Sequence, residues 1–415
     1  MRILFFTDYY RPEPPPPAHH IAERAAIWRR AGHEVTIVTN HPNYPEGRVY
    51  PGFRNRLRSV EMTPDGVRLV RVWTYVAGHD RQVLKLADHA SFFASAVAQA
   101  VREPTPDVVV ATSPHLFAGL AGVAYARLVR RPLLLEIRDL WPEQVLSPSS
   151  PAFGPFRAMA RFLYRSSHTV SVMTPLFVQH VEREGAARVS VVVGGADLAR
   201  FAPGPRPIHL LREHGLEDNF VVGYPGTLGT GHDIELIAKA GEHLRGSRVK
   251  LLFIGGGPRL ERLKMLVLDS CPDVFTFVPT QPSDRMVDWW RAMDAGLVLL
   301  RRTKELSLVV PSKLFESMAC GKPIVFVGPR GAGSQIVESA GAGPIVDDGD
   351  PASVAQAVLS LACDSSRYQL HSKRALEAAP RYSRDRHADE TLDLLKQMAF
   401  GRRNRSRTCH DHQGG

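Results

Sequence analysis

The segment from Val309 to Phe326, VVPSKLFESMACGKPIVF, carries residues whose types and spacing suit a chemical function. A helical pattern with Lys313 and Glu316 in its first turns ends at Gly321 and Pro323, before a short apolar strand. A helix start with a lysine attracts anions, because unpaired N–H groups and the helix dipole favour negative charge. The Glu316 carboxylate can accept hydrogen bonds from the paired hydroxyls of a ribose. Together they indicate a nucleoside diphosphate, although an ordinary helix–strand unit with a surface lysine and glutamate has the same spacing.

Apolar strands and helical segments alternate along the rest of the chain, which is typical of doubly wound parallel sheets. We expect strands at 1–7, 34–39, 107–111, 132–136, 220–224, 250–254, 274–278 and 296–300, and helices at 20–30, 116–128, 258–269 and 284–293. The sequence therefore predicts an α/β protein with two domains, residues 1–202 and 203–382, joined where prolines and a glycine crowd together at 203–207. A helix at 383–400 and a basic, disordered tail at 401–415 are expected to follow.

Composition is that of a soluble globular protein. The chain has 415 residues, of which 44% are hydrophobic and 23% charged, and it contains no apolar run near the roughly 20 residues that span a bilayer. A strand begins at Met1, so we expect no signal peptide. The four cysteines are scattered, which favours reduced thiols in a cytosol, and neither they nor the pair His19–His20 has metal-ligand spacing. We expect no metal and a cytoplasmic protein.

The net charge of +10 and the pI of about 9.6 indicate an anionic partner, or simply an arginine-rich proteome. Anionic phospholipid and phosphorylated acceptors fit this charge. Nucleic acid fits poorly, because no recognition helix, zinc finger or aromatic-studded basic sheet is evident. Two segments, 81–101 and 155–165, combine apolar and basic residues and could lie on a membrane surface, although core-facing helices have the same pattern.

The motif Pro-Ser-Lys-x-x-Glu-x-Met-Ala-x-Gly-x-Pro-Ile at 311–324 resembles the C-terminal signature of family 4 retaining glycosyltransferases. The resemblance implies GT-B architecture, in which two Rossmann-like domains face a cleft and a C-terminal helix crosses back to the first domain. It also implies a nucleotide-sugar donor, with Glu316 on the donor ribose and the diphosphate at the helix start. Many members have a second glutamate eight positions upstream, where this chain has Leu308.

The same resemblance suggests the remaining donor-site residues. Lys313 would stabilise charge on the leaving diphosphate, helped by amides around Ser312 and Leu314. The turn 224–232 resembles the glycine-rich turn of the family, but Thr227 and His232 stand near the places where relatives carry an arginine and a lysine. The donor-binding residues expected from these motifs are Gly226, Thr227, Gly229, His232, Gly255, Gly257, Val278, Ser312, Lys313, Leu314 and Glu316. Plain structural turns explain the glycines equally well.

Motifs in the first half, at 30–39, 43–47, 111–114 and 136–143, resemble the WbuB-type branch, which transfers amino sugars in polysaccharide assembly. His115 follows one strand and Arg138 and Asp139 follow the next, where ligands bind in open α/β sheets. We expect these three residues to face the acceptor and the donor sugar, although Arg138 and Asp139 could be a structural ion pair. The first loop carries prolines at 14–17 where relatives have small residues, so His19 or His20 would have to replace lost N–H donors.

The function that the resemblance implies is transfer of a sugar, expected to be an N-acetylated amino sugar, from a UDP donor to a hydroxyl of a polysaccharide or lipid-linked precursor. The alternatives are a small-molecule secondary-metabolite acceptor, or a non-catalytic partner subunit that binds nucleotide sugar. The departures at Leu308, Thr227 and His232 motivate the latter. A dinucleotide-dependent oxidoreductase is not supported, because no G-x-G-x-x-G follows the first strand.

Overall fold

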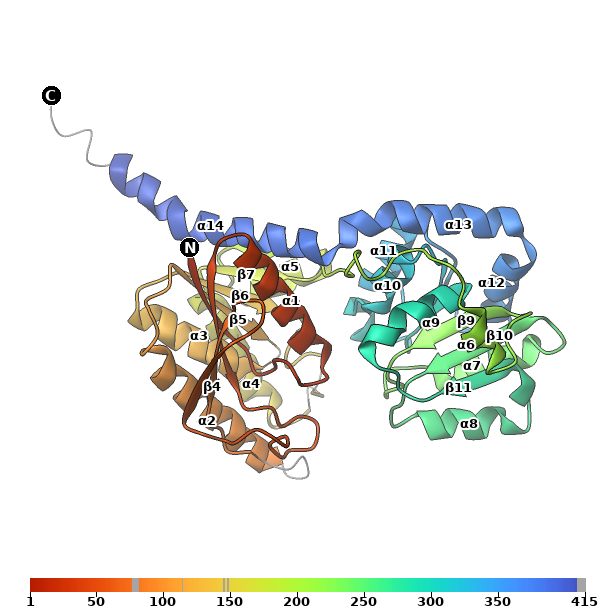
Figure 1. The fold of residues 1–415 in the computed structure, drawn as a ribbon, viewed down its shortest axis with the longest axis horizontal. Coiled ribbons are helices and arrows are strands. Elements are labelled where there is room, and N and C mark those ends of the chain that lie inside the picture. Colours follow the sequence, from red (N-terminus) through yellow and green to blue (C-terminus); the bar gives the residue numbers. More distant parts are fainter. Residues whose placement is uncertain (77–81, 114, 145, 148, 409–415) are drawn as a thin grey trace. The chain divides into compact units, whose positions relative to one another are not determined.

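The computed structural model describes residues 1–76, 82–113, 115–144, 146–147 and 149–408 (Figure 1). The chain forms two compact units. Unit 1 comprises Met1–Val193 with His387–Gly415, and unit 2 comprises Gly194–Arg386. The units thus divide nine residues before the boundary expected at 202, and the C-terminal segment returns to unit 1. Over the described residues, no helix is both long and apolar enough to cross a membrane.

Unit 1 is built on an eight-stranded sheet in the order β3-β4-β2-β1-β5-β6-β7-β8, parallel except for β3. Its strands are β1 (Arg2–Phe6), β2 (Glu34–Asn40), β3 (Arg58–Met62), β4 (Arg68–Val72), β5 (Val108–Ser113), β6 (Leu133–Ile137), β7 (Thr169–Val172) and β8 (Val189–Val191). Continuous apolar runs form β1, β5 and β6 because helices cover both faces of the sheet. The sequence analysis did not find β3 and β4, whose charged residues interrupt the apolar pattern.

Two sets of helices cover the sheet of unit 1. On one face α1 (Pro16–Arg30) and α14 (Arg384–Thr408) bury a cluster that includes Ile3, Trp28 and Leu395. On the other, α3 (Leu116–Leu128) packs on β1, β5 and β6 and is flanked by α2 (Gln82–Ala100) and α4 (Phe153–Ser166). A Cβ at Gly122 of α3 would lie 2.6 Å from the Cβ of Ala111, so glycine allows this close approach. The unit also contains α5 (Val178–Arg183).

Unit 2 contains a six-stranded parallel sheet in the order β11-β10-β9-β12-β13-β14. Its strands are β9 (Phe220–Pro225), β10 (Val249–Ile254), β11 (Phe275–Val278), β12 (Ala295–Leu299), β13 (Ile324–Val327) and β14 (Ile345–Val346). Its helices are α6 (Ile208–Arg212), α7 (Ile234–His243), α8 (Leu260–Leu268), α9 (Met286–Ala292), α10 (Lys313–Ala319), α11 (Ala332–Ala340), α12 (Pro351–Cys363) and α13 (Ser365–Ala378). The strand order reverses direction at β9 and β12, which is where open α/β sheets bind ligands at their carboxyl edge.

Two boundaries differ from the sequence-based expectation. Helix α1 begins at Pro16 rather than near residue 20. The N–H groups of the first helical turn have no acceptor within the helix, so prolines there cost no hydrogen bond. Helix α14 continues to Thr408, so the backbone of residues 401–408 is helical where we expected a disordered tail. Residues 409–415 lie outside the described part of the chain.

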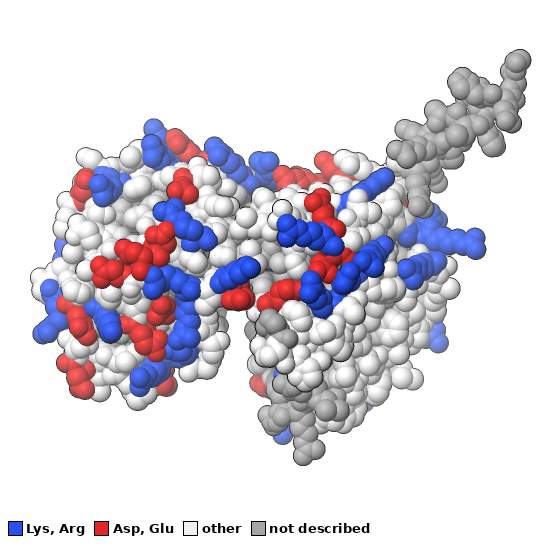
Figure 2. Space-filling view, turned by 180° about the vertical axis from the view of Figure 1, so that it is seen from behind, with Lys and Arg blue, Asp and Glu red and all other residues white. Residues whose placement is uncertain are grey.

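The two segments considered for a membrane surface are packed helices. Phe92 and Ala96 of α2 and Leu163 of α4 are buried, whereas Leu86 and Phe162 are exposed. The segment 81–101 begins at residue 81, which lies outside the described residues. Figure 2 shows basic and acidic side chains interspersed over the face that it displays. The positive net charge is therefore not gathered into one basic stripe on that face.

Candidate functional site

The turn that follows β9 is tied to the loop that follows β10. The amide of Gly226 donates a hydrogen bond to the carbonyl oxygen of Ile254 (2.8 Å), and the amide of Leu228 donates to that of Gly256 (2.8 Å). Gly226 has a φ of 132°, a conformation that side chains rarely adopt. The turn is therefore held in one place at the carboxyl edge of the sheet of unit 2.

Gly255 and Gly257 make this loop-to-loop contact possible. A Cβ at Gly255 would lie 2.4 Å from the carbonyl oxygen of Gly226, and one at Gly257 would lie 2.5 Å from that of Leu228. The Gly255 amide donates to the carbonyl oxygen of Val278, at the buried end of β11 (3.0 Å). The structure thus gives Gly255, Gly257 and Val278 a supporting position around the turn.

Within the turn, most amides are already engaged. The Gly229 amide donates to Nδ1 of His232 (2.8 Å), and the two bonds above occupy the amides of Gly226 and Leu228. Over the described residues, the Thr227 amide has no recorded acceptor. The same Nδ1 lies 3.1 Å from the carbonyl oxygen of Gly229, so it accepts from the amide or donates to the carbonyl according to the tautomer of the ring. Burial lowers the pKa of His232, so the neutral form dominates near neutral pH.

The amine of Lys313 lies over this turn. Its Nζ is 3.2 Å from the centroid of the Tyr224 ring and 3.5 Å from the position that a Cβ on Gly226 would occupy. No carboxylate lies within ion-pair distance of Lys313 among the described residues. Burial lowers the pKa of this lysine well below its usual value, and the charge of Glu316 only partly opposes that shift. An incoming anion would favour the ammonium form again.

Glu316 lies one turn further along α10 and is held by a residue that the sequence analysis missed. The indole Nε1 of Trp290, in α9, donates to Oε2 of Glu316 (2.9 Å). Burial raises the pKa of Glu316, whereas the indole hydrogen bond and the charges of Arg384 and Lys313 lower it. Among the described residues no donor bonds to Oε1, the second carboxylate oxygen, so it can accept from a ligand hydroxyl. The tryptophan carries no sequence signal beyond its apolar character.

The N-terminus of α10 differs from the expectation in one respect. The Leu314 amide donates to the carbonyl oxygen of Pro311 (3.1 Å), and its side chain is buried, so Leu314 offers no free donor to a ligand. Ser312 is exposed at the helix start. Leu308, which stands in place of a second glutamate, ends the short 3₁₀ turn Leu306–Leu308. The structure therefore brings Gly226, Thr227, His232, Ser312, Lys313 and Glu316 to one edge of the sheet.

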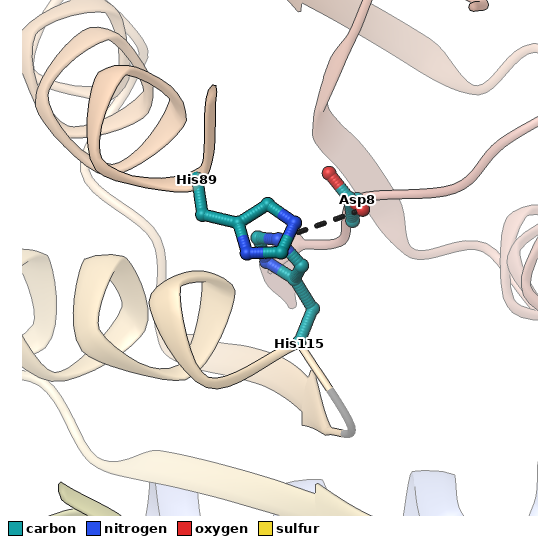
Figure 3. A group of neighbouring side chains, drawn as sticks. All are labelled: Asp8, His89 and His115. Atoms are coloured by element: carbon teal, nitrogen blue, oxygen red, sulfur yellow. Dashed lines mark ion pairs between the residues drawn. The ribbon is translucent and has the colours of Figure 1, made fainter. Parts of the chain in front are cut away.

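A second group of titratable side chains lies at the carboxyl edge of the sheet of unit 1. Asp8 follows β1, His89 is in α2, and His115 caps the N-terminus of α3 (Figure 3). Nε2 of His115 is 3.6 Å from Oδ2 of Asp8, and the two histidine rings pack edge to face with centroids 4.0 Å apart. Asn40 donates to the other carboxylate oxygen of Asp8 (3.2 Å).

Burial decides the charges of this cluster. It raises the pKa of Asp8 to about 7 and lowers those of His115 and His89 to about 3. Both rings are therefore neutral near neutral pH. Nε2 of His115 is buried without a hydrogen-bond partner among the described residues. The cluster thus offers a ligand a carboxyl group and a ring nitrogen that is not already engaged.

The donor set Asp-His-His suits a divalent metal, and one ligand atom from each residue lies within 4.8 Å of the others. The spacing of the two histidine rings, however, does not suit such an ion. Two imidazoles on a tetrahedral ion, with Zn–N of about 2.0–2.1 Å, would have ring centroids about 5 Å apart rather than 4.0 Å. In addition, Nδ1 of His115 accepts from the Ala118 amide (3.3 Å), which favours a proton on Nε2, the atom nearest Asp8. The side chains would therefore have to move for all three residues to bind one ion.

Arg138 and Asp139, the other predicted residues of unit 1, are not joined by an ion pair within the part of the chain that the structure describes. Nε of Arg138 donates to Oγ1 of Thr112 at the end of β5 (3.3 Å). Burial lowers the pKa of Arg138 to about 10, against the opposing charge of Glu136. Asp139 is exposed. Residue 114, between Ser113 and His115, lies outside the described residues.

Sequence reasoning missed a buried ion pair behind Arg138. Arg24 of α1 makes two hydrogen bonds to Glu136 of β6, at 2.5 and 2.7 Å, and its Nη1 lies 3.1 Å from Nε2 of His387 in α14. Nδ1 of His387 in turn lies 3.0 Å from the carbonyl oxygen of Val193. This network joins three elements of unit 1 that are far apart in the sequence. Glu136 stands in an apolar strand, and that unusual placement is the signal that could have revealed it.

Comparison with known proteins agrees with this architecture. Residues 17–195 match the family model "Glycosyl transferase 4-like domain", and residues 219–364 match "Glycosyl transferases group 1". The chain is 24% identical to the putative colanic acid biosynthesis glycosyl transferase WcaI of Escherichia coli over 341 residues, covering 77% of this chain and 82% of that protein. It is 32% identical to D-inositol 3-phosphate glycosyltransferase of Acidothermus cellulolyticus over 230 residues, covering 52% and 49%.

Solved structures show the same fold. Anabaena Alr3699/HepE in complex with UDP-glucose superposes with a TM-score of 0.71 at 17% identity, over 96% of this chain and 100% of that chain. Sucrose-phosphate synthase of Thermosynechococcus elongatus superposes with a TM-score of 0.78 at 16% identity, over 95% and 98%. The two sheets and these matches define a two-domain glycosyltransferase with the GT-B fold. The two family models place the chain among the glycosyltransferases of the family 4 type.

Proposed function

We propose that the enzyme transfers a sugar from a UDP-linked donor to a hydroxyl group of a saccharide acceptor, and that unit 2 binds the donor. The position of the Lys313 amine over the Gly226 turn supports this proposal most directly, because the two offer a cation and an amide to one anion. Glu316 lies one helical turn away and would accept from the ribose hydroxyls. UDP and UDP-glucose occupy crystals of a protein with this fold, Alr3699/HepE.

The chemistry of the proposed site is electrostatic. When the bond from the sugar to the diphosphate breaks, negative charge gathers on the leaving oxygens. Lys313, the Thr227 amide and the ring of His232 are the groups of this chain that would stabilise that charge. Ser312 would add an amide at the start of α10. Because the protein supplies a cation and N–H donors here, we propose that no metal ion is required.

For the acceptor side we propose His115, Arg138 and Asp139, with Asp8 beside His115. The likeness to WcaI, whose name refers to colanic acid, and the motifs similar to the WbuB-type branch support a polysaccharide or lipid-linked acceptor and an N-acetylated amino sugar. A small-molecule acceptor remains the alternative within the same activity. We place the reaction in the cytoplasm, with or without contact to an anionic membrane surface.

Calorimetric binding of UDP, GDP and ADP tests the donor assignment. We expect selective binding of UDP that Lys313→Ala weakens at least tenfold, because a charge-assisted contact contributes about 1.5–3 kcal/mol. Lys264→Ala, the same substitution at an exposed lysine of α8, serves as the control and leaves binding unchanged. Absence of binding by any nucleotide would refute the donor site and favour the non-catalytic partner role.

Two further measurements separate the remaining alternatives. Transfer or hydrolysis of UDP-sugars by the purified protein, lost in Glu316→Ala, would exclude a non-catalytic partner, for which the departures at Leu308 and Thr227 argue. The metal proposal is tested by the rate of the same reaction after treatment with EDTA. An unchanged rate is expected, and a loss that Mn²⁺ or Mg²⁺ restores would contradict it.

A further inference from the structure

We infer that Tyr224 is the positioning residue of the donor site, fixing both the amine of Lys313 and the glycine-rich turn. The inference rests on the proposed function and names a residue to which neither the motifs nor the fold assigns a role. Tyr224 is the penultimate residue of β9 and 1% exposed. A buried tyrosine at a strand end is ordinarily a core residue, and its contacts here go beyond that.

The ring of Tyr224 holds Lys313. Nζ lies 3.2 Å from the ring centroid, over its face, which is the geometry of a cation–π contact. Lys313 has no carboxylate within ion-pair distance among the described residues, so the aromatic face is the contact that orients its amine. A flexible lysine side chain without such a contact would spread over several rotamers. The ring therefore keeps the amine beside Gly226.

The hydroxyl of Tyr224 holds the turn. It donates to the carbonyl oxygen of Thr227 (3.1 Å), the residue whose amide has no recorded acceptor. The planar peptide unit that contains this carbonyl also carries the Leu228 amide, which donates to the carbonyl oxygen of Gly256, so the hydroxyl fixes the turn immediately after Thr227. The ring meets the edge of His232 (centroids 5.6 Å apart) and stacks on Phe253 (5.4 Å), which anchors it in the core. Three residues expected at the donor site, Thr227, His232 and Lys313, thus contact one side chain.

Replacement of Tyr224 should affect the binding of the diphosphate and not that of the nucleoside. Lys313 and Thr227 would contact the diphosphate, whereas the uracil and ribose would contact other residues. Replacing Tyr224 should therefore weaken binding of UDP while leaving binding of uridine unchanged. Tyr224→Leu removes the aromatic face and the hydroxyl, and we expect a fall of about 10- to 30-fold in the ratio of UDP to uridine affinity. Tyr224→Phe keeps the face and should lower the ratio by roughly 2- to 10-fold.

The matched control is Phe275→Leu. Phe275 is 7% exposed and stacks on Phe253, and among the described residues it makes no ring contact with Tyr224, so the variant makes a similar core cavity in the same unit and should leave the ratio unchanged. Equal losses of UDP and uridine binding in Tyr224→Leu, or no loss of UDP binding, would overturn the inference. So would a ratio that falls as far in Phe275→Leu.

If the wild-type protein binds no nucleoside diphosphate, the proposed function fails, and Lys313 itself then tests the role of Tyr224. The readout is the rate at which trinitrobenzenesulfonate labels Lys313, followed by mass spectrometry of the peptide. Removal of the covering ring in Tyr224→Leu should raise that rate at least tenfold above that of Phe275→Leu. Equal rates in the two variants would overturn the inference.

Discussion

The indole of Trp290 should control how Glu316 binds a ribose. In Trp290→Phe the aromatic core is largely retained, but the hydrogen bond from Nε1 to Oε2 of Glu316 (2.9 Å) is lost. A hydrogen bond to a charged group contributes about 1.5–3 kcal/mol. Because that hydrogen bond stabilises the charged carboxylate, its loss should raise further the pKa of Glu316, which burial already raises.

The direction of the pH dependence follows from that shift. A carboxyl group with a raised pKa is protonated over a wider range, and the neutral form is a poorer acceptor for ribose hydroxyls. We expect the UDP affinity of Trp290→Phe to lie below that of the wild type by about tenfold at the acidic end of the titration and to recover as the pH rises through the variant's raised pKa. Calorimetry between pH 6 and 9 measures both effects.

Two controls distinguish this effect from general damage. Trp289→Phe removes the same atoms from a neighbouring residue that is 3% exposed and has no recorded hydrogen bond to Glu316, so it should leave the pH profile unchanged. With 2′-deoxy-UDP in place of UDP, the Trp290→Phe effect should shrink, because one ribose hydroxyl is absent. The reasoning is refuted if both nucleotides lose affinity equally, or if the Trp289 variant behaves in the same way.

Three further outcomes are expected. Gly255→Ala should weaken UDP binding at least tenfold, since its Cβ would lie 2.4 Å from the carbonyl oxygen of Gly226, whereas Gly246→Ala, also at positive φ but with no atom within 4 Å, should bind normally in the same titration. Arg24→Ala should destabilise unit 1 by about 3–5 kcal/mol in urea denaturation, because it leaves Glu136 charged, buried and unpaired, and a loss no greater than that of the exposed Arg161→Ala would contradict this. Burial raises the pKa of Asp8 to about 7 from 3.8, so the folded state holds its proton between these values and stability falls as the pH rises through them. Asp8→Asn should therefore gain thermal stability relative to wild type from pH 5 to pH 8, and parallel curves for the two proteins would disprove the shift.

Local patterns in the sequence were sufficient for the fold class and most elements. Apolar runs such as 107–111 and 132–136 locate strands that are buried on both faces, and these strands lie at β5 and β6. The motif around Lys313 located α10 and its two charged residues. Charged strands escaped this reasoning, because β3 and β4 are ordered by pairing with β2 and with each other, which no local pattern records.

What each site residue touches was decided by tertiary structure alone. The motif predicted that Lys313 and Glu316 lie at a helix start, but not that Tyr224 would lie beneath one and Trp290 beside the other. It predicted that glycines form turns, but not that the turn after β9 packs against Gly255 and Gly257 so closely that neither position has room for a side chain. Asp8 and His89 could not be linked to His115 from their sequence positions. The sequence by itself determined those strands and helices whose apolar pattern is continuous or periodic, because such patterns are local. Contacts between distant segments, and the pKa shifts that depend on burial, were decided by the tertiary structure. In each unit the sheet brings together the carboxyl ends of strands that are far apart in the sequence.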